Sequence, residues 1–169
     1  MVNTKLTMTT NDEYYTPDEV WENIWDYLPN CDTVFEPFYG EGHTWRWLDD
    51  SCIYDTVLGK KDLNFFSDEA SELLTRCDCV ISNPPFSLKY DIIKKLVVSD
   101  TPFILLLPLF TVNTIAFYDT FGDAIDHVSL IVPKGRIKFI SEGTVAKSPS
   151  FETVYVCWKT EIPKLVFLK

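Results

Sequence analysis

Residues 78–86 read Asp-Cys-Val-Ile-Ser-Asn-Pro-Pro-Phe, an apolar run that stops on an amide, two prolines and an aromatic ring. One interpretation is structural, an Asn-Pro turn that closes a buried strand. The other is chemical, because the Asn83 amide oxygen and the Pro84 carbonyl can together accept both N–H bonds of an amino group. Pro84 and Pro85 fix φ and bring no competing N–H donors, so the acceptor pair is held rigidly.

An amino group on an aromatic ring needs such help, because its lone pair is delocalised into the ring. Two acceptors would draw the nitrogen toward tetrahedral geometry and direct its lone pair outward. Phe86 offers a flat face for the ring that carries the amine. The motif therefore predicts a pocket for an exocyclic amino group, with four catalytic residues: Asn83, Pro84, Pro85 and Phe86.

A second motif lies upstream at residues 32–42, Asp-Thr-Val-Phe-Glu-Pro-Phe-Tyr-Gly-Glu-Gly, which predicts a strand running into a glycine turn. A phosphate site is disfavoured, because Glu36 and Glu41 would repel a pyrophosphate and the full P-loop string with its lysine is missing. A cationic ligand fits better. An acid at the strand end can hold an ammonium group, while Gly40 and Gly42 allow close backbone approach.

Residues 83–86 resemble the catalytic motif of S-adenosylmethionine-dependent amino-methyltransferases, above all those acting on adenine N6. Residues 36–42 resemble the cofactor loop of the same family, acid-Pro-Phe-x-Gly-x-Gly. Residues 14–19, Tyr-Tyr-Thr-Pro-Asp-Glu, resemble the Tyr-x-Thr-Pro segment that lines the methionine end of the pocket. The resemblance spans roughly residues 14–158 and implies S-adenosylmethionine as cofactor, with no metal.

The family also has an acid after the second strand for the cofactor ribose and an Asp followed by aromatics for its adenine. Asp55 has a suitable separation from Glu36, with the alternative that it only marks a strand end. Asp62 with Phe65 or Phe66 matches the adenine grip. The resemblance thus implies one set of cofactor-binding residues: Tyr15, Thr16, Pro17, Glu36, Pro37, Phe38, Gly40, Gly42, Asp55, Asp62, Phe65 and Phe66. Thr16, Pro17 and Glu19 also form a capping-box pattern for a following helix.

Residues 133–139, Pro-Lys-Gly-Arg-Ile-Lys-Phe, resemble the Pro-x-x-Arg-Ile-x-Phe stretch of small phage and giant-virus adenine methyltransferases. The resemblance implies that Arg136 and Lys138 contact phosphate and that Phe139 supports the target base. Lys89 lies close to Phe86 in the sequence and is a further candidate substrate contact. The structural alternative for this stretch is a hairpin turn at residues 134–135 with solvated cations.

Charge opposes a nucleic-acid substrate, since the net charge of −10 and a pI near 4.6 disfavour binding a polyanion. The charge is uneven, however. Residues 1–78 hold 17 acids and 5 bases, a net of −12, whereas residues 79–169 hold 8 acids and 10 bases, a net of +2. Substrate contact is therefore expected in the half that carries Asn83. A homodimer, a helper subunit, or a small or single-stranded substrate would each compensate for the weak attraction.

Strand and helix patterns alternate, which predicts an α/β fold. Strands are expected near 32–36, 53–58, 78–82, 103–108, 127–132 and 153–158, and helices near 17–28, 43–49, 68–76, 88–98 and 113–121. Residues 163–169 read as a final strand or a contact surface. We expect one Rossmann-like methyltransferase domain over residues 1–169, without a separate target-recognition domain. Its sheet should be mostly parallel, with helices on both faces and an antiparallel last strand. Ligands sit beyond the carboxyl ends of such strands, so Glu36 and Asn83 should meet at one crevice.

The cysteines, the histidines and the longest apolar run argue against a zinc-binding, disulfide-linked or membrane-spanning protein. Five scattered cysteines, two histidines and no Cys-x-x-Cys pair predict reduced thiols in a soluble intracellular protein and no zinc site. The longest apolar run, residues 102–110, is interrupted by Pro108 and is too short for a membrane span. The resulting hypothesis is methylation of adenine N6 in DNA or RNA. Two alternatives remain: an amino-methyltransferase acting on a protein glutamine or a small amine, and a catalytically silent partner subunit.

Overall fold

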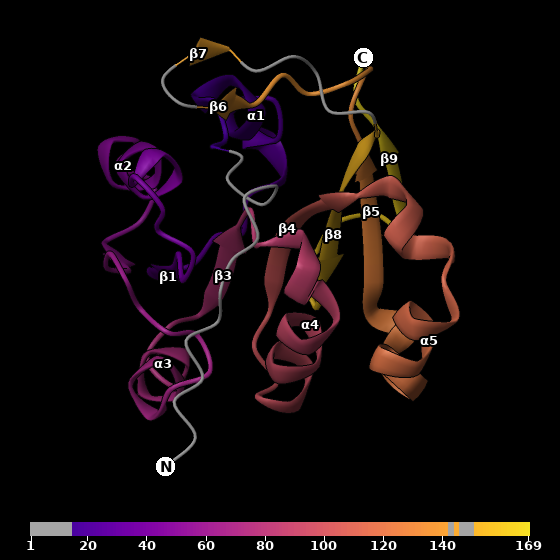
Figure 1. The fold of residues 1–169 in the computed structure, drawn as a ribbon, viewed down its shortest axis with the longest axis horizontal. Coiled ribbons are helices and arrows are strands. Elements are labelled where there is room, and N and C mark those ends of the chain that lie inside the picture. Colours follow the sequence, from indigo (N-terminus) through magenta and orange to yellow (C-terminus); the bar gives the residue numbers. More distant parts are fainter. Residues whose placement is uncertain (1–14, 142–143, 146–150) are drawn as a thin grey trace.

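The computed structural model describes residues 15–141, 144–145 and 151–169, and it is built around a seven-stranded sheet (Figure 1). The strand order is β2-β1-β3-β4-β8-β5-β9. The strands are β1 (Thr33–Phe35), β2 (Thr56–Leu58), β3 (Cys79–Ser82), β4 (Phe103–Pro108), β5 (Val128–Val132), β8 (Thr153–Trp158) and β9 (Leu165–Phe167). A two-stranded ribbon of β6 (Ile140–Ser141) and β7 (Thr144–Val145) lies apart from this sheet.

Two apolar clusters show that helices cover both faces of the sheet. The α-helices are α1 (Asp18–Glu22), α2 (His43–Asp50), α3 (Asp68–Leu74), α4 (Lys89–Val98) and α5 (Ile115–Phe121). Buried residues of α3, α4 and α5 pack in one cluster, and those of α1 and α2 pack in the other. Figure 1 shows α3, α4 and α5 gathered on one side of the strands and α1 and α2 toward the opposite side. This layered arrangement confirms the predicted α/β class.

Strand direction decides which loops meet. β8 is antiparallel to both of its neighbours, β4 and β5, while every other pairing in the large sheet is parallel. The residues that follow β1, β3, β4 and β5 therefore emerge at one edge of the sheet, where β8 begins. We call this the carboxyl edge. The strand at 153–158 is antiparallel as predicted, but it is not the last, because β9 follows it and pairs in parallel with β5.

The first helix departs from the prediction. Residues 17–28 do not form one helix: α1 ends at Glu22 and a short 3₁₀ helix, η1 (Trp25–Tyr27), follows. The capping box is also wrong, because Pro17 occupies the N-cap position and no side chain caps the helix. The break at Ile24, with φ −112° and ψ 16°, shifts the helical phase so that Trp25 is exposed while Val20 and Trp21 remain buried.

Three further 3₁₀ helices connect the elements: η2 (Phe86–Leu88), η3 (Leu109–Asn113) and η4 (Gly122–His127). The alternative of a hairpin at residues 134–135 is wrong, since β5 pairs with β8 and β9 and residues 136–139 run on toward β6 instead of returning along β5. None of the described helices is long and apolar enough to cross a membrane.

Candidate active site

Glu36, the residue directly after β1, is a buried acid at the carboxyl edge. Its side chain is 1% exposed, and its Oε1 accepts hydrogen bonds from the backbone N–H of Phe38, at 2.8 Å, and from the Ser82 hydroxyl. Burial raises the pKa of the Glu36 carboxyl to about 8, although both hydrogen bonds favour the ionised form. A carboxyl held at this pKa can be neutral in the empty site and ionise when a cation binds beside it.

The glycine turn after Glu36 brings the backbone close to aromatic rings. Gly40 and Gly42 have φ values of +51° and +79°, a region in which side chains are strained. A Cβ on Gly42 would lie 2.7 Å from the Tyr39 ring, and one on Gly40 would lie 3.0 Å from the Tyr15 ring. Gly42 is also the N-cap of α2, so the turn leads directly into that helix. These two positions therefore require glycine, as the motif predicts.

A third glycine, Gly59, was not singled out by its sequence. It follows β2, and its Cα faces the backbone of Glu36 so closely that an added Cβ would lie 2.6 Å from the Glu36 carbonyl oxygen and 2.8 Å from the Trp45 ring. Gly59 thus allows the ends of β1 and β2 to approach each other. In the sequence, the one signal for this role of Gly59 was its position directly after a strand.

Replacing Gly59 by alanine should displace the backbone at Glu36 and weaken cofactor binding by about tenfold or more, because a backbone oxygen cannot move aside as a flexible side chain would. Isothermal titration with S-adenosylmethionine measures this loss. Gly122→Ala is the matched control, since Gly122 also has positive φ, +53°, but nothing lies within 4 Å of its added Cβ. Equal affinity in the two variants would contradict the close approach.

Tyr15 lies against the glycine turn, since a Cβ added to Gly40 would lie 3.0 Å from its ring, and Thr16 follows it in the chain. The backbone of Tyr15 pairs with that of Ile140, with N···O distances of 3.0 and 2.9 Å. Thr16 is 2% exposed, and its hydroxyl has no hydrogen-bond partner among the described residues. A buried hydroxyl usually has one. Its availability fits a polar ligand in the crevice, and Pro17 follows it as the N-cap of α1.

The loop after β2 lies against the glycine turn, because Lys61 forms an ion pair with Glu41 at 3.3 Å. Within this loop Asp62 adopts φ +60°, which is uncommon for a residue other than glycine and costs free energy. Of the two candidate aromatics, Phe65 is buried and packs on Phe38 with ring centroids 5.1 Å apart. Phe66 is 40% exposed and presents the more accessible ring.

The position of Asp55 does not support its predicted role in binding the cofactor ribose. It precedes β2, whose first residue, Thr56, lies beside Thr33 at the start of β1. Because the two strands are parallel, Asp55 lies at the amino edge of the sheet, whereas Glu36 lies at the carboxyl edge. Its separation from Glu36 in the sequence suggested the ribose-binding acid that follows the second strand, but β2 begins one residue after Asp55 and ends at Leu58. Asp55 is therefore not placed with the other cofactor candidates.

The Asn83 motif emerges beside Glu36. Ser82, the last residue of β3, is fully buried, and its hydroxyl bonds to Glu36, so the two predicted motifs lie next to each other at the carboxyl edge. Asn83 itself is half-buried, while Pro84 and Pro85 are buried and hold the turn. Ser82 is a functional candidate that the sequence analysis missed. The signal for it was a small hydroxyl residue between an apolar strand and the amide.

Phe86 opens η2 at the end of this turn and is half-buried. The Lys89 ammonium donates to the Phe86 carbonyl at 3.0 Å and lies 4.6 Å from the centroid of the Tyr90 ring. Lys89 is thus held next to the motif, as a substrate-contacting cation would need to be. Lys89 therefore lies near the motif, as the sequence predicts, and its contact with a substrate stays a prediction.

The other predicted substrate-binding residues do not lie together in the structure. Phe139 is fully buried in the apolar cluster under α1 and α2. Its predicted contact with a target base is therefore wrong, because a side chain without exposed surface cannot stack on a ligand. Arg136 and Lys138 are exposed, and Arg136 forms an ion pair with Glu152 at 3.0 Å.

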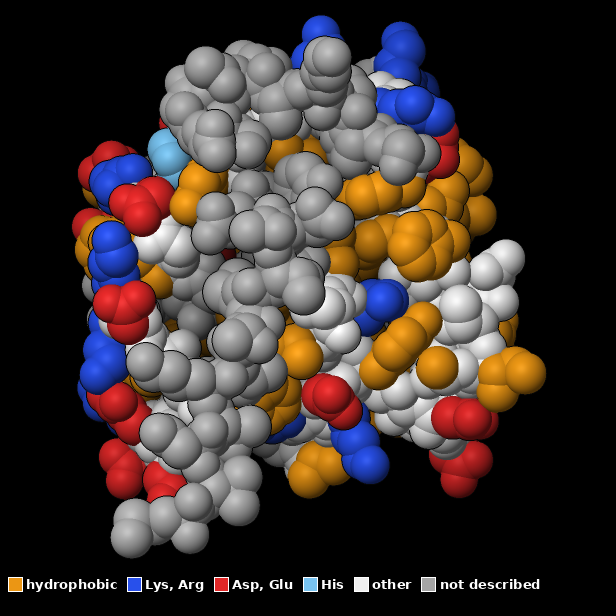
Figure 2. Space-filling model, viewed as in Figure 1, with side chains coloured by type: hydrophobic (Ala, Val, Ile, Leu, Met, Phe, Trp, Pro, Cys, Tyr) orange, Lys and Arg blue, Asp and Glu red, His pale blue; other side chains and the backbone are white. Residues whose placement is uncertain are grey.

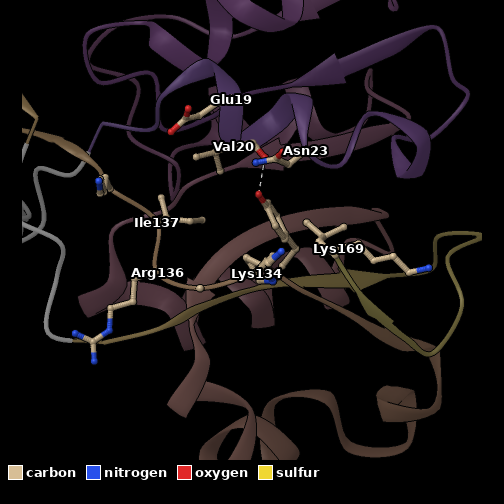
Figure 3. A pocket seen from close by; sticks show the side chains of 12 residues that line it. Glu19, Val20, Asn23, Lys134, Arg136, Ile137 and Lys169 are labelled. Atoms are coloured by element: carbon tan, nitrogen blue, oxygen red, sulfur yellow. Dashed lines mark hydrogen bonds between the residues drawn. The ribbon is translucent and has the colours of Figure 1, made fainter.

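Arg136 and Lys138 also line a hollow of about 320 Å³ between α1, the segment 133–138 and the end of the chain (Figure 3). Glu19 of α1 and Asn23, the C-cap of that helix, form its upper wall, and the Tyr155 hydroxyl donates to the Val20 carbonyl across it. Neither Glu36 nor Asn83 lines this hollow. This hollow is therefore separate from the place at which the two motifs meet.

Comparison with known proteins agrees with this arrangement. Residues 49–127 match a family model described as adenine-specific methyltransferase EcoRI. The crystal structure of a putative class I S-adenosylmethionine-dependent methyltransferase from Listeria monocytogenes superposes with a TM-score of 0.51. It is 15% identical and covers 96% of this chain and 67% of that chain. This likeness confirms the predicted Rossmann-like fold.

A second crystal structure, of a SAM-dependent methyltransferase from Archaeoglobus fulgidus, gives a TM-score of 0.45 at 14% identity, covering 84% of this chain and 92% of that chain. No sequence in the curated set of proteins matches this chain.

Proposed function

We propose that this chain is an S-adenosylmethionine-dependent methyltransferase of the adenine-specific type and that it methylates N6 of adenine in nucleic acid. The family match over residues 49–127 and the fold support this proposal. DNA is the first substrate to test and RNA the second. One observation carries the proposal. The Ser82 hydroxyl bonds to the buried Glu36 carboxyl, which joins the end of the cofactor loop to the residue directly before Asn83.

S-adenosylmethionine, when bound, supplies the methyl group from its sulfonium centre. The residues suited to hold it are those around the glycine turn: Tyr15, Thr16, Pro17, Glu36, Pro37, Phe38, Gly40, Gly42, Asp62 and Phe66. Glu36 suits the ammonium end, because a buried carboxylate gains most from an adjacent cation. The orphaned Thr16 hydroxyl offers a further hydrogen bond. Phe65 supports this site from the core by packing on Phe38.

On the substrate side, the Asn83 oxygen and the Pro84 carbonyl accept the two N–H bonds of the adenine amine, which localises the nitrogen lone pair. Phe86 stacks on the base. Both strands that carry these groups end at the same edge, so the acceptors and the cofactor acid are positioned by rigid elements. No covalent bond to the protein is required in this scheme.

Nucleic-acid contact is assigned to the cations near the carboxyl edge, Lys89, Arg136 and Lys138. They are few, which fits the acidic composition and suggests that recognition of a sequence comes from a second copy or a helper subunit. The competing proposal, methylation of a protein glutamine or a small amine, rests on the acidic pI. It shares the same acceptor pair, so only the product distinguishes the two.

The decisive experiment incubates the chain with radiolabelled S-adenosylmethionine and, in separate reactions, DNA, RNA and protein. Products are digested and identified by mass spectrometry. N6-methyladenine from DNA or RNA is the expected product. Methylglutamine with unmodified nucleic acid would replace this proposal with the protein substrate, and label in none of the three would support a catalytically silent subunit.

A further inference from the structure

Three aromatic rings from three separate segments meet at the carboxyl edge beside the Asn83 turn. Phe86 follows β3, Phe110 follows β4 in η3, and Phe151 precedes β8. The ring of Phe151 lies 5.6 Å from that of Phe86 and 6.2 Å from that of Phe110, with interplanar angles of 80° and 85°. We call these three rings the edge cluster. Only Phe86 belongs to a motif that the sequence singled out.

The edge cluster is open to a ligand at Phe110, whose side chain is 54% exposed. The adjoining helix α5 adds the ring of Tyr118, which is 57% exposed. Figure 2 shows hydrophobic side chains gathered on this face over β5 and α5, with cationic side chains among them. An apolar surface of this kind beside a catalytic motif marks a contact site.

Two cations border the edge cluster. The Lys89 ammonium lies 6.0 Å from the Phe110 ring centroid and is fixed by its hydrogen bond to the Phe86 carbonyl. The second cation, Arg136, pairs with Glu152, which follows Phe151 in the chain. Surfaces that bind single-stranded nucleic acid combine aromatic rings, on which bases stack, with cations that contact the phosphates.

We propose that the edge cluster holds the nucleotide next to the target adenine by stacking on Phe110, so that the enzyme takes its adenine from an unpaired strand. The inference rests on the proposed function and specifies its substrate class. In a duplex the bases beside the target remain stacked on each other, and an exposed ring gains nothing from them. With a net charge of −10, stacking is also the contribution that this chain can make without a basic surface.

The test measures binding separately from catalysis. Fluorescence anisotropy with a labelled single-stranded oligonucleotide containing one adenine, and with the same strand in a duplex, gives the two affinities for wild type, Phe110→Ala and Phe110→Trp. Wild type should bind the single strand more tightly than the duplex. Phe110→Ala should weaken single-strand binding by about tenfold, and Phe110→Trp should restore it, because the larger ring still stacks.

Ile115→Ala is the matched control, since it removes exposed apolar surface from the same face without removing a ring. It should leave single-strand affinity unchanged. Tighter binding of the duplex by wild type, or equal affinity in Phe110→Ala, would overturn the inference. An equal loss in Ile115→Ala would also overturn it, because the affinity would then come from general apolar contact and not from stacking on a ring.

Failure of this inference is distinguishable from failure of the proposed function. Wild type that forms N6-methyladenine in duplex DNA, with no effect of Phe110→Ala, keeps the function and rejects the stacking. Wild type that binds the single strand through Phe110 and yields no N6-methyladenine keeps the stacking and rejects the function. Thermal unfolding of each variant, followed by circular dichroism, shows that a changed affinity is not a loss of folding.

Discussion

Replacing Asn83 by alanine is expected to lower the rate of methyl transfer by a factor of at least about 100 while leaving the affinity for S-adenosylmethionine unchanged. The loss follows because alanine removes the acceptor that localises the amine lone pair, whereas the cofactor residues lie around Glu36 and the glycine turn. Single-turnover kinetics give the rate, and isothermal titration gives the cofactor affinity.

A second variant tests whether the acceptor oxygen of Asn83 is needed, independently of its NH₂ group. Asn83→Asp keeps an acceptor oxygen in the same place and should retain more activity than Asn83→Ala. Asn30→Ala is the matched control, since Asn30 is exposed and precedes β1, at the amino edge of the sheet. If Asn83→Ala turned over at the wild-type rate, the acceptor pair would have no role and the adenine assignment would lose its chemical basis.

Most of the elements could be predicted because local sequence marks their ends. The strand at 103–108 is an uninterrupted apolar run, which fits β4, buried along its whole length between two neighbours. Helix α5 begins after Thr114, whose hydroxyl accepts a hydrogen bond from the N–H of Phe117, as expected of an N-cap. The short ribbon of β6 and β7 was missed, since two-residue strands leave no periodic pattern.

The errors arose where burial and chemistry give the same signal. Tyr54 is buried, so its apolar character suggested a strand from residue 53, but it lies in the loop before β2, which begins at Thr56. Phe139 has the residue type of a base contact and fills the core instead. Phe110 and Phe151 meet although they are far apart in the sequence, because β4 and β8 pair antiparallel with Pro108 beside Thr153.

The same limit applies to Ser82. Its contact with Glu36 depends on the pairing of β1 with β3, which sets Phe35 beside Val80. In the sequence, Glu36 and Asn83 belong to two separate motifs. In the structure, the register of β1 and β3 brings them to the same edge of the sheet, and the Ser82 hydroxyl links them. The residues that carry the chemistry were therefore predictable by type, and the contacts that position them required the fold.

The buried Glu36 carboxyl should make the stability of the empty protein fall as the pH rises from about 4.5 to about 8. Burial raises its pKa from 4.5 to about 8 in the folded state, so between these values the folded protein holds a proton that the unfolded chain has lost. Unfolding is then favoured by rising pH, with a slope of at most about 1.4 kcal/mol per pH unit. Urea titrations at several pH values give the free energy of unfolding.

Other perturbed groups do not obscure this window. The buried thiols, such as Cys77 with its pKa raised to about 12, stay protonated in the folded and unfolded states below pH 8. Glu152, whose pKa is lowered chiefly by its hydrogen bond from Arg136, titrates below the window. Glu36→Gln keeps an amide oxygen as acceptor for Phe38 and Ser82 and cannot ionise, so its stability should vary less with pH than that of wild type.

Cofactor binding should reverse the protonation of Glu36. An ammonium group beside the carboxyl favours its ionised form, so S-adenosylmethionine should displace about one proton at pH 6.5 and bind more tightly as the pH rises toward 8. Titration calorimetry in two buffers of different ionisation enthalpy counts the released protons. Glu36→Gln should release none and bind about 10 to 100 times more weakly, since it loses a charge-assisted contact. Proton release from wild type equal to that from Glu36→Gln would show that the ammonium lies elsewhere, and the buried acid would then be only a structural link between β1 and β3.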